Sequence, residues 1–209
     1  MFEQDTLMLF ILAAVLLLLT PGPAVLYIVA RSVSQGTLAG LVATLGVHVG
    51  TLVHITAAAY GVSRLLMTST TAFNIVKYLG AAYLVYLGVR SFLGRAEPAS
   101  SSKGGPEHKQ LFTVFRESIV VNVLNPKTAL FFFAFLPQFV NPAGEAAVAV
   151  QIIVLGLIFI AVGILSDGLY AVFAGALGDR LKSTGSRYGK YITGTVFTGL
   201  GIMTAFARR

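Results

Sequence analysis

Long apolar runs separated by short polar segments repeat along the whole chain, and they restrict what it can fold into. Six such runs lie at about residues 7–30, 38–62, 72–93, 112–140, 146–173 and 188–207. A helix needs about 20 mainly apolar residues to cross the hydrocarbon layer of a bilayer. The strands of a membrane barrel would be shorter and would alternate in polarity. The runs therefore predict an all-α integral membrane protein with six transmembrane helices.

The composition supports a membrane location. Hydrophobic residues make up 56% of the chain and charged residues only 11%, whereas soluble domains contain about a quarter charged residues. Residues 7–19 follow Glu3 and Asp5 rather than basic residues. We therefore expect a first span that is retained, not a secretory signal peptide.

Basic residues indicate the orientation. The net charge is +7, but basic residues do not interleave with aromatic ones as in a nucleic-acid groove. We expect membrane lipid as a partner and no nucleic acid. Ten lysines and arginines lie beside the connections after the first, third and fifth runs, four lie on the other side, and Lys127 lies inside a run. The positive-inside rule then predicts that both termini are outside the cell.

A polar segment divides the chain into two halves. Residues 95–110 are rich in serine, glycine and charged residues, which predicts a flexible cytoplasmic linker between three-helix repeats at 1–94 and 111–209. Proline breaks the first helix of each half, and the third helix of each half opens with Lys-Tyr, at Lys77 and Lys190. Three spans per half place the copies in opposite orientations, which is typical of inverted-repeat secondary transporters.

The first run is broken by Thr20, Pro21, Gly22 and Pro23. Two prolines remove two backbone donors and do not fit a regular helix interior. The carbonyl groups freed there need protein, water or substrate as partners, and the Thr20 hydroxyl is a further possible ligand. We expect these four residues to bind substrate. The alternative is a simple kink that does not contact substrate.

The fourth run is broken by Asn125, Pro126 and Lys127, with Asn122 one turn earlier. A lysine near the middle of the membrane costs about 2.5–3.5 kcal/mol to insert and should face a cavity or a partner. Its ammonium group is suited to a substrate carboxylate, so we expect all four residues to line a substrate site. The alternative is a lysine that extends to the cytoplasmic interface.

Ionisable residues also lie in the second and fifth runs, which occupy equivalent places in the two halves. These are His48, His54 and Asp167. Histidine titrates near neutral pH, and ionisable groups inside membranes often carry protons. We expect His48 and Asp167 to carry a coupling proton. A histidine that only hydrogen-bonds a neighbouring helix is the more common case and stays open. For His54 and Asp167 the alternative is a position near a helix end, where either residue is tolerated. Gly46 and Gly50 are expected to allow close helix packing.

Motifs of enzymes and metal sites are missing from the sequence. It contains no GxSxG, HExxH or P-loop motif and no cysteine, so we expect no enzymatic activity, no cofactor and no metal site.

Several short motifs occur together at a characteristic spacing: Thr20-Pro21-Gly22-Pro23, Ser34-Gln35-Gly36, Ala39-Gly40, Gly46, Gly50 and Asn125-Pro126-Lys127. Over essentially the whole chain they resemble the LysE/RhtB family of bacterial amino-acid exporters. Proline directly after threonine is most similar to the homoserine/threonine-exporter branch. In the family the first motif often continues with Asn or Asp, where this chain has Ala24.

The resemblance implies a multi-pass protein of the bacterial inner (plasma) membrane. It would export homoserine, threonine or other neutral amino acids, with proton antiport and alternating access between the two broken helices. The expected partners are an amino acid, a proton and lipid, and a homo-oligomer is possible. The open alternatives are an exporter of another metabolite or a divalent metal, a passive channel, and a non-transporting scaffold.

Overall fold

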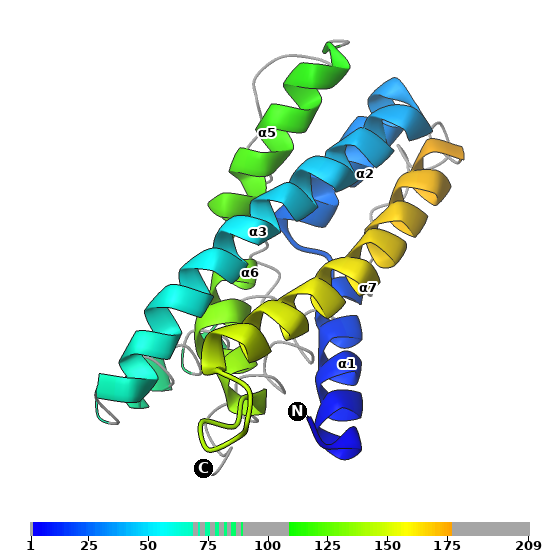
Figure 1. Ribbon diagram of the computed structural model, residues 1–209. Coiled ribbons are helices and arrows are strands. Elements are labelled where there is room, and N and C mark those ends of the chain that lie inside the picture. The colour runs from blue at the N-terminus through cyan, green and yellow to red at the C-terminus, as the bar shows by residue number, and fades with distance from the viewer. Residues whose placement is uncertain are drawn as a thin grey trace.

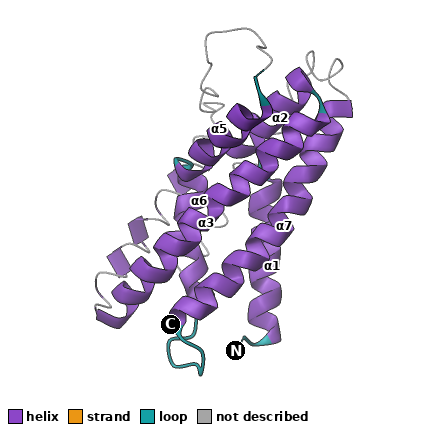
Figure 2. Ribbon diagram, turned by 45° about the horizontal axis from the view of Figure 1, so that its top comes forward, coloured by secondary structure: helices purple, strands orange, loops and turns teal. Residues whose placement is uncertain are grey.

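The computed structural model describes residues 2–68, scattered positions between 71 and 89, and residues 109–176. Every regular element among these residues is a helix (Figures 1 and 2), which confirms the all-α class for this part of the chain. The elements are α1 (Gln4–Leu19), α2 (Pro23–Gln35), α3 (Thr37–Thr68), α5 (Leu111–Val123), α6 (Pro126–Leu130), the π-helix η1 (Phe131–Phe135), the 3-10 helix η2 (Leu136–Phe139) and α7 (Val148–Ala176).

The helices α3 and α7 are long, unbroken and antiparallel, and they lie side by side (Figure 1). Helix α2 packs against both of them, and α5 packs along α3. Helix α1 runs from the break before α2 to the end of the molecule that holds the N-terminus, at an angle to α2. At that same end, residues 140–147 form the loop that joins η2 to α7 (Figure 2).

Both predicted helix breaks are present. Helices α1 and α2 are bent by 51° at their break, and α5 is bent by 48° relative to the segment that follows it. Pro23 and Pro126 each stand in the first turn of the second limb, where a missing backbone N–H costs nothing. Asn125 caps its limb, because its side-chain oxygen accepts a hydrogen bond from the Lys127 backbone N–H at 3.1 Å. Proline is thus common to both breaks, and a side-chain cap is added at the second.

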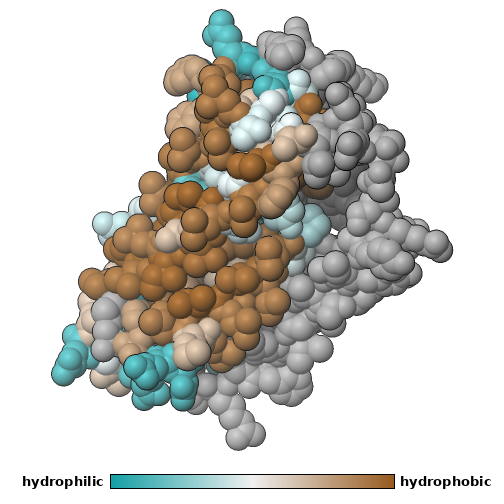
Figure 3. Space-filling model, turned by 90° about the vertical axis from the view of Figure 1, so that its right-hand side faces the viewer, coloured by the Kyte–Doolittle hydropathy of each residue, from teal (hydrophilic) through white to brown (hydrophobic). Residues whose placement is uncertain are grey.

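Two helices, α3 over Thr37–Gly61 and α7 over Val148–Ala176, are long and apolar enough to cross a membrane. Each bent pair passes the same test when taken together, so the described residues hold two to four candidate spans. Figure 3 shows a broad apolar surface between hydrophilic atoms at the two ends of one face. A contiguous apolar exterior of this kind fits the hydrocarbon of a bilayer.

Part of the predicted architecture lies outside the described residues. The sixth predicted span, at 188–207, lies entirely outside them, and the third span, at 72–93, and the linker at 95–110 lie mostly outside. The count of six spans, the inverted repeat and the domain division at 1–94, 95–110 and 111–209 therefore stay predictions.

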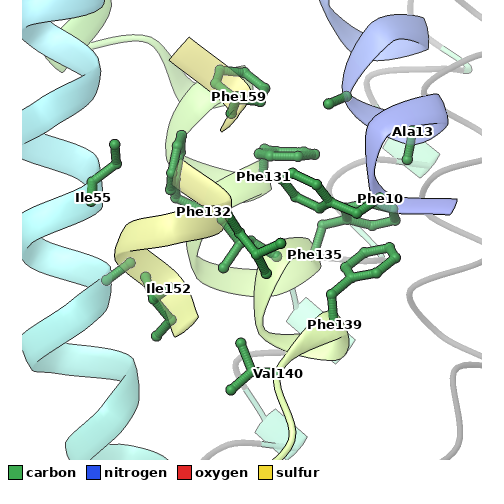
Figure 4. Packing of buried hydrophobic residues seen from close by; sticks show 14 of the residues in the cluster. Phe10, Ala13, Ile55, Phe131, Phe132, Phe135, Phe139, Val140, Ile152 and Phe159 are labelled. Atoms are coloured by element: carbon green, nitrogen blue, oxygen red, sulfur yellow. The ribbon is translucent and has the colours of Figure 1, made fainter. Parts of the chain in front are cut away.

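The described part contains two apolar clusters. The larger one, which we call the aromatic cluster, lies between the breaks and the 140–147 loop and is rich in phenylalanine (Figure 4). The smaller one, the small-residue cluster, packs α2, α3, α5 and α7 together beyond the breaks. Its buried members are Ala24, Ile28, Ala43, Val47, Val114 and Ala171.

Helix α3 approaches α5 too closely to allow side chains at the glycines between them. A Cβ atom on Gly46 would collide with the backbone carbonyl of Phe115 and the hydroxyl of Ser118. A Cβ atom on Gly50 would lie 2.9 Å from the carbonyl oxygen of Ile119. The expected packing role of Gly46 and Gly50 is therefore confirmed.

Candidate functional site

The two helix breaks are joined by a lysine. Lys127 Nζ donates a hydrogen bond to the carbonyl oxygen of Thr20 at 2.6 Å. The lysine side chain lies along Gly22, where a Cβ atom would be only 3.0 Å from Lys127 Cδ. Only 7% of Lys127 is exposed. The side chain therefore points into the protein and does not extend to the cytoplasmic interface.

The last carbonyl groups of α1 accept hydrogen bonds from side chains. Besides the bond from Lys127 to Thr20, the Tyr170 hydroxyl on α7 donates to the Leu19 carbonyl at 2.8 Å. The Thr20 hydroxyl donates to the Leu16 carbonyl at 2.8 Å. Protein groups thus supply the partners that a broken helix needs inside a membrane. Sequence reasoning missed Tyr170, because a tyrosine near a helix end has no distinctive local pattern.

Asn122 holds α5 against α3. Its amide nitrogen donates to the Val47 carbonyl at 2.7 Å and to the Thr51 hydroxyl at 2.9 Å. Its amide oxygen accepts from the Thr128 hydroxyl at 3.0 Å. Its backbone carbonyl lies 2.9 Å from His54 Nε2. Asn122 therefore binds protein groups on every side and fixes the second break against α3.

His54 has a packing role. Besides its contact with the Asn122 carbonyl, its ring stacks on Phe132, with centroids 6.2 Å apart, and meets Phe133 edge-on. This arrangement corresponds to the alternative of a histidine that hydrogen-bonds a neighbouring helix.

His48 and Asp167 meet across the interface between α3 and α7. Their Nε2 and Oδ2 atoms are 3.2 Å apart, and 4% and 2% of these residues are exposed. A Cβ atom on Gly163 would collide with the His48 ring, so this glycine makes the room for it. Within the described part of the chain, both ring nitrogens of His48 and Oδ1 of Asp167 have no hydrogen-bond partner. Such groups are rare in protein interiors and call for an explanation.

The two breaks and the His48–Asp167 pair surround one cavity. Its volume open to water is about 20 Å³, which admits about one water molecule and is too small for an amino acid. Apolar residues from both clusters, together with Val25 and two threonines, form the rest of the wall. The lining consists of Leu17, Leu18, Gly22, Ala24, Val25, Val47, His48, Thr51, Asn122, Asn125, Lys127, Thr128, Phe159 and Asp167.

Four of the predicted substrate residues line this cavity: Gly22, Asn122, Asn125 and Lys127. The other four lie outside its lining and act through the backbone. Thr20 offers its carbonyl to Lys127, while Pro21, Pro23 and Pro126 shape the breaks.

A second ionic cluster lies at the end of the molecule opposite the N-terminus. The Tyr27 hydroxyl donates to Glu117 Oε2 at 2.8 Å, and Arg31 Nη2 lies 3.6 Å from the same oxygen. Lys109 Nζ contacts Oε1 of Glu117, and the Gln35 amide donates to the Lys109 carbonyl at 2.7 Å. This Glu117 cluster connects the end of α2 with the start of α5.

Sequence reasoning overlooked the Glu117 cluster, although a signal was present. Of the eight acidic residues, only Glu117 and Asp167 lie inside the predicted membrane runs. An acidic residue there should have a partner.

Among the described residues, no group of three or more His, Cys, Asp and Glu side chains could hold a metal ion.

Broken helices, an apolar exterior and a buried ionic cavity define the protein as a membrane translocator. The family model for LysE type translocators matches residues 15–208. The chain therefore belongs to the LysE type translocator family, and the resemblance seen in its motifs is confirmed.

The chain is also similar to individual membrane and efflux proteins. An uncharacterized membrane protein of Vibrio cholerae is 31% identical over 201 residues, which cover 95% of this chain and 96% of the relative. One of Pseudomonas aeruginosa is 33% identical over 207 residues, covering 95% and 94%. The leucine efflux protein of Salmonella typhimurium is 34% identical over 133 residues, covering 63% and 62%. No solved structure matches the chain.

Proposed function

We propose that this translocator exports neutral amino acids from a bacterial cell across the inner membrane. The observation that carries the proposal is the placement of one cation and one anion, Lys127 and Asp167, in the lining of a single buried cavity. A free amino acid is a zwitterion and presents the opposite pair of charges. Similarity to leucine efflux proteins supports the same class of substrate.

Lys127 binds the substrate carboxylate in this mechanism. Its ammonium group has a single hydrogen-bond acceptor among the described residues, the Thr20 carbonyl, and it carries three N–H donors. A carboxylate that enters the cavity can take the remaining donors or displace the carbonyl. A charge-assisted bond in a dry site is about twice as strong as a neutral one. The buried cation thereby gains a counterion when substrate binds.

Asp167 couples substrate export to proton entry. Its carboxylate can hold either the substrate ammonium group or a proton, but not both. On the cytoplasmic side it binds the ammonium, and on the outside it takes up a proton as the substrate leaves. His48, whose Nε2 lies 3.2 Å from Asp167 Oδ2, positions the carboxylate and relays the proton. Because the Asp167 carboxylate cannot hold the ammonium group and a proton at once, each exported amino acid is exchanged for a proton.

Alternating access requires that the cavity open to one side at a time. The aromatic cluster forms the outer closure, and the Glu117 cluster together with the small-residue cluster forms the inner closure. The closures differ in composition, because the outer one buries large rings and the inner one consists of alanine, valine and isoleucine side chains beneath partly exposed ion pairs. The halves rock around the breaks, and this motion also enlarges the cavity for its substrate.

Efflux from proteoliposomes tests the proposal. Vesicles loaded with a mixture of amino acids are analysed by mass spectrometry with and without an imposed pH gradient. Selective loss of neutral amino acids, increased by the gradient, is the expected result. Counterflow of labelled substrate separates a carrier from a channel, since a channel shows none. If a folded preparation releases no amino acid, the proposal is wrong and other metabolites must be tested.

A further inference from the structure

Helix α7 presents three residues toward the cavity region at a spacing of four. Phe159 and Asp167 line the cavity, and Gly163 lies between them against the His48 ring. Residues four apart lie on one face of a helix. Eight residues rise by about 12 Å along the helix axis. Phe159 and Asp167, the two ends of this stripe, therefore contribute to the cavity lining from two levels of α7, about two turns apart.

The two ends of the stripe differ in chemistry. Asp167 shares its part of the cavity with His48, to which it is paired. Phe159 belongs to the aromatic cluster, and two other members of that cluster, Leu17 and Leu18, line the same cavity. These three side chains form a wall, here called the apolar wall, that carries no polar atom. A substrate with its charged groups near Asp167 and Lys127 would place its side chain toward this wall.

Most other polar groups of the cavity have partners in the protein. The Thr51 hydroxyl donates to the Val47 carbonyl at 3.2 Å and accepts from Asn122. The Thr128 hydroxyl donates to Asn122 Oδ1 at 3.0 Å. Among cavity-lining side chains in the described part of the chain, the buried atoms without a partner belong to His48 and Asp167. A hydroxyl on the substrate side chain would therefore find few free partners.

The apolar wall is held rigidly. Only 3% of Phe159 is exposed, and its ring centroid lies 4.7 Å from that of Phe131 and 5.3 Å from that of Phe132 (Figure 4). Close-packed rings do not move aside easily. As long as the aromatic cluster stays closed, the position of Phe159 therefore limits how long a bound substrate side chain can be.

We infer that Phe159, with Leu17 and Leu18, is the specificity-determining wall for the substrate side chain, and that the transporter selects unbranched and branched aliphatic amino acids. This inference rests on the proposed function. Hydroxylated substrates such as homoserine and threonine bind less well, because burying an unpaired hydroxyl is unfavourable. Aromatic substrates are excluded by the ring of Phe159.

The test is competition in counterflow, with labelled leucine and unlabelled leucine, isoleucine, methionine, threonine, homoserine and phenylalanine. The unmodified protein should prefer leucine to threonine and to phenylalanine by about tenfold or more, the scale of discrimination by an apolar pocket. Phe159→Ala should raise competition by phenylalanine relative to leucine about tenfold. Phe159→Val should give a smaller change in the same direction.

The matched control is Phe173→Ala, the same substitution on the same helix at a side chain that is 60% exposed; the preference should not change. Should Phe159→Ala fail to yield monodisperse protein, Phe159→Val decides the question. A preference of the unmodified protein for threonine or homoserine would overturn the inference. So would a fall in counterflow that is equal for all substrates in the Phe159 variants. The proposed export of amino acids would stand in both cases. Absence of any amino-acid counterflow would instead reject the proposed function.

Discussion

Lys127 Nζ lies 2.6 Å from the carbonyl oxygen of Thr20, and this hydrogen bond joins two helix breaks that are 107 residues apart in the chain. One break belongs to α1 and α2 and the other to α5 and α6. A lysine that is buried and bound to a freed helix carbonyl holds the two broken helices in contact. A movement of the backbone at one break therefore changes the hydrogen bond that the other break makes with it.

Replacing Lys127 by methionine, which has a similar length and no charge, should strongly reduce transport. The substitution removes the cation for the substrate carboxylate and leaves the Thr20 carbonyl without its donor. We expect at least a tenfold fall in counterflow, the effect of a change of about 1.4 kcal/mol or more in binding. Arg116→Met, at an exposed basic residue on α5, should transport normally. Normal counterflow by well-expressed Lys127→Met would disprove the carboxylate role.

His48→Gln should separate transport from its driving force. The glutamine can still support Asp167 by hydrogen bonding, but it cannot relay a proton. Substrate counterflow should persist, while the acceleration by an imposed pH gradient should fall severalfold. His54→Gln is the matched control, because His54 is a buried histidine on the same helix that contacts the Asn122 carbonyl. Equal responses to the gradient in both variants would exclude His48 from coupling.

Gly163→Ala should impair both folding and transport. The added methyl group would collide with the His48 ring, and overpacking of this kind costs about 1–3 kcal/mol. In Gly168→Ala, on the same helix, the new Cβ atom would meet no described atom within 4 Å. We expect a lower melting temperature in detergent for Gly163→Ala only. Similar melting temperatures for the two variants would show that His48 moves aside without loss.

Gly46→Ala tests the packing of α3 on α5. The obstacle there includes the backbone carbonyl of Phe115, which cannot rotate away as a side chain can, so the helices must separate. The expected result is a loss of stability of about 1–3 kcal/mol. Gly61→Ala is the control on the same helix, because among the described residues its Cβ atom meets nothing within 4 Å. A stable, active Gly46→Ala protein would show that α3 and α5 can move apart.

A reversible cross-link tests the inner closure. The chain contains no cysteine, so Tyr27→Cys with Glu117→Cys introduces the only two thiols. A short bis-methanethiosulfonate reagent, which forms a mixed disulfide with each thiol and releases sulfinate, should join α2 to α5 and stop counterflow. A reductant cleaves both disulfides and should restore it. Each single variant treated in the same way should keep transporting. Undiminished counterflow in the cross-linked protein would mean that the substrate path does not require α2 and α5 to separate.

Much of the local structure could be predicted from the sequence, because its causes are local. The length of each apolar run reaches or exceeds what a bilayer requires, and this predicted helices such as α3 and α7. Pro23 and Pro126 cannot continue a preceding helix, and both breaks are found there. The motifs around these prolines also indicated the LysE type translocator family, which the family model confirms.

The sequence by itself thus determined the helical membrane class, the two breaks and the family. Only the tertiary structure decided which polar groups meet. In the structure Lys127 contacts Thr20 and His48 contacts Asp167. The side chain of Asn122 holds α5 against α3. These contacts join residues far apart in the chain, and their geometry depends on how closely helices approach. No local pattern encodes that distance, because it is set by packing at glycines such as Gly163.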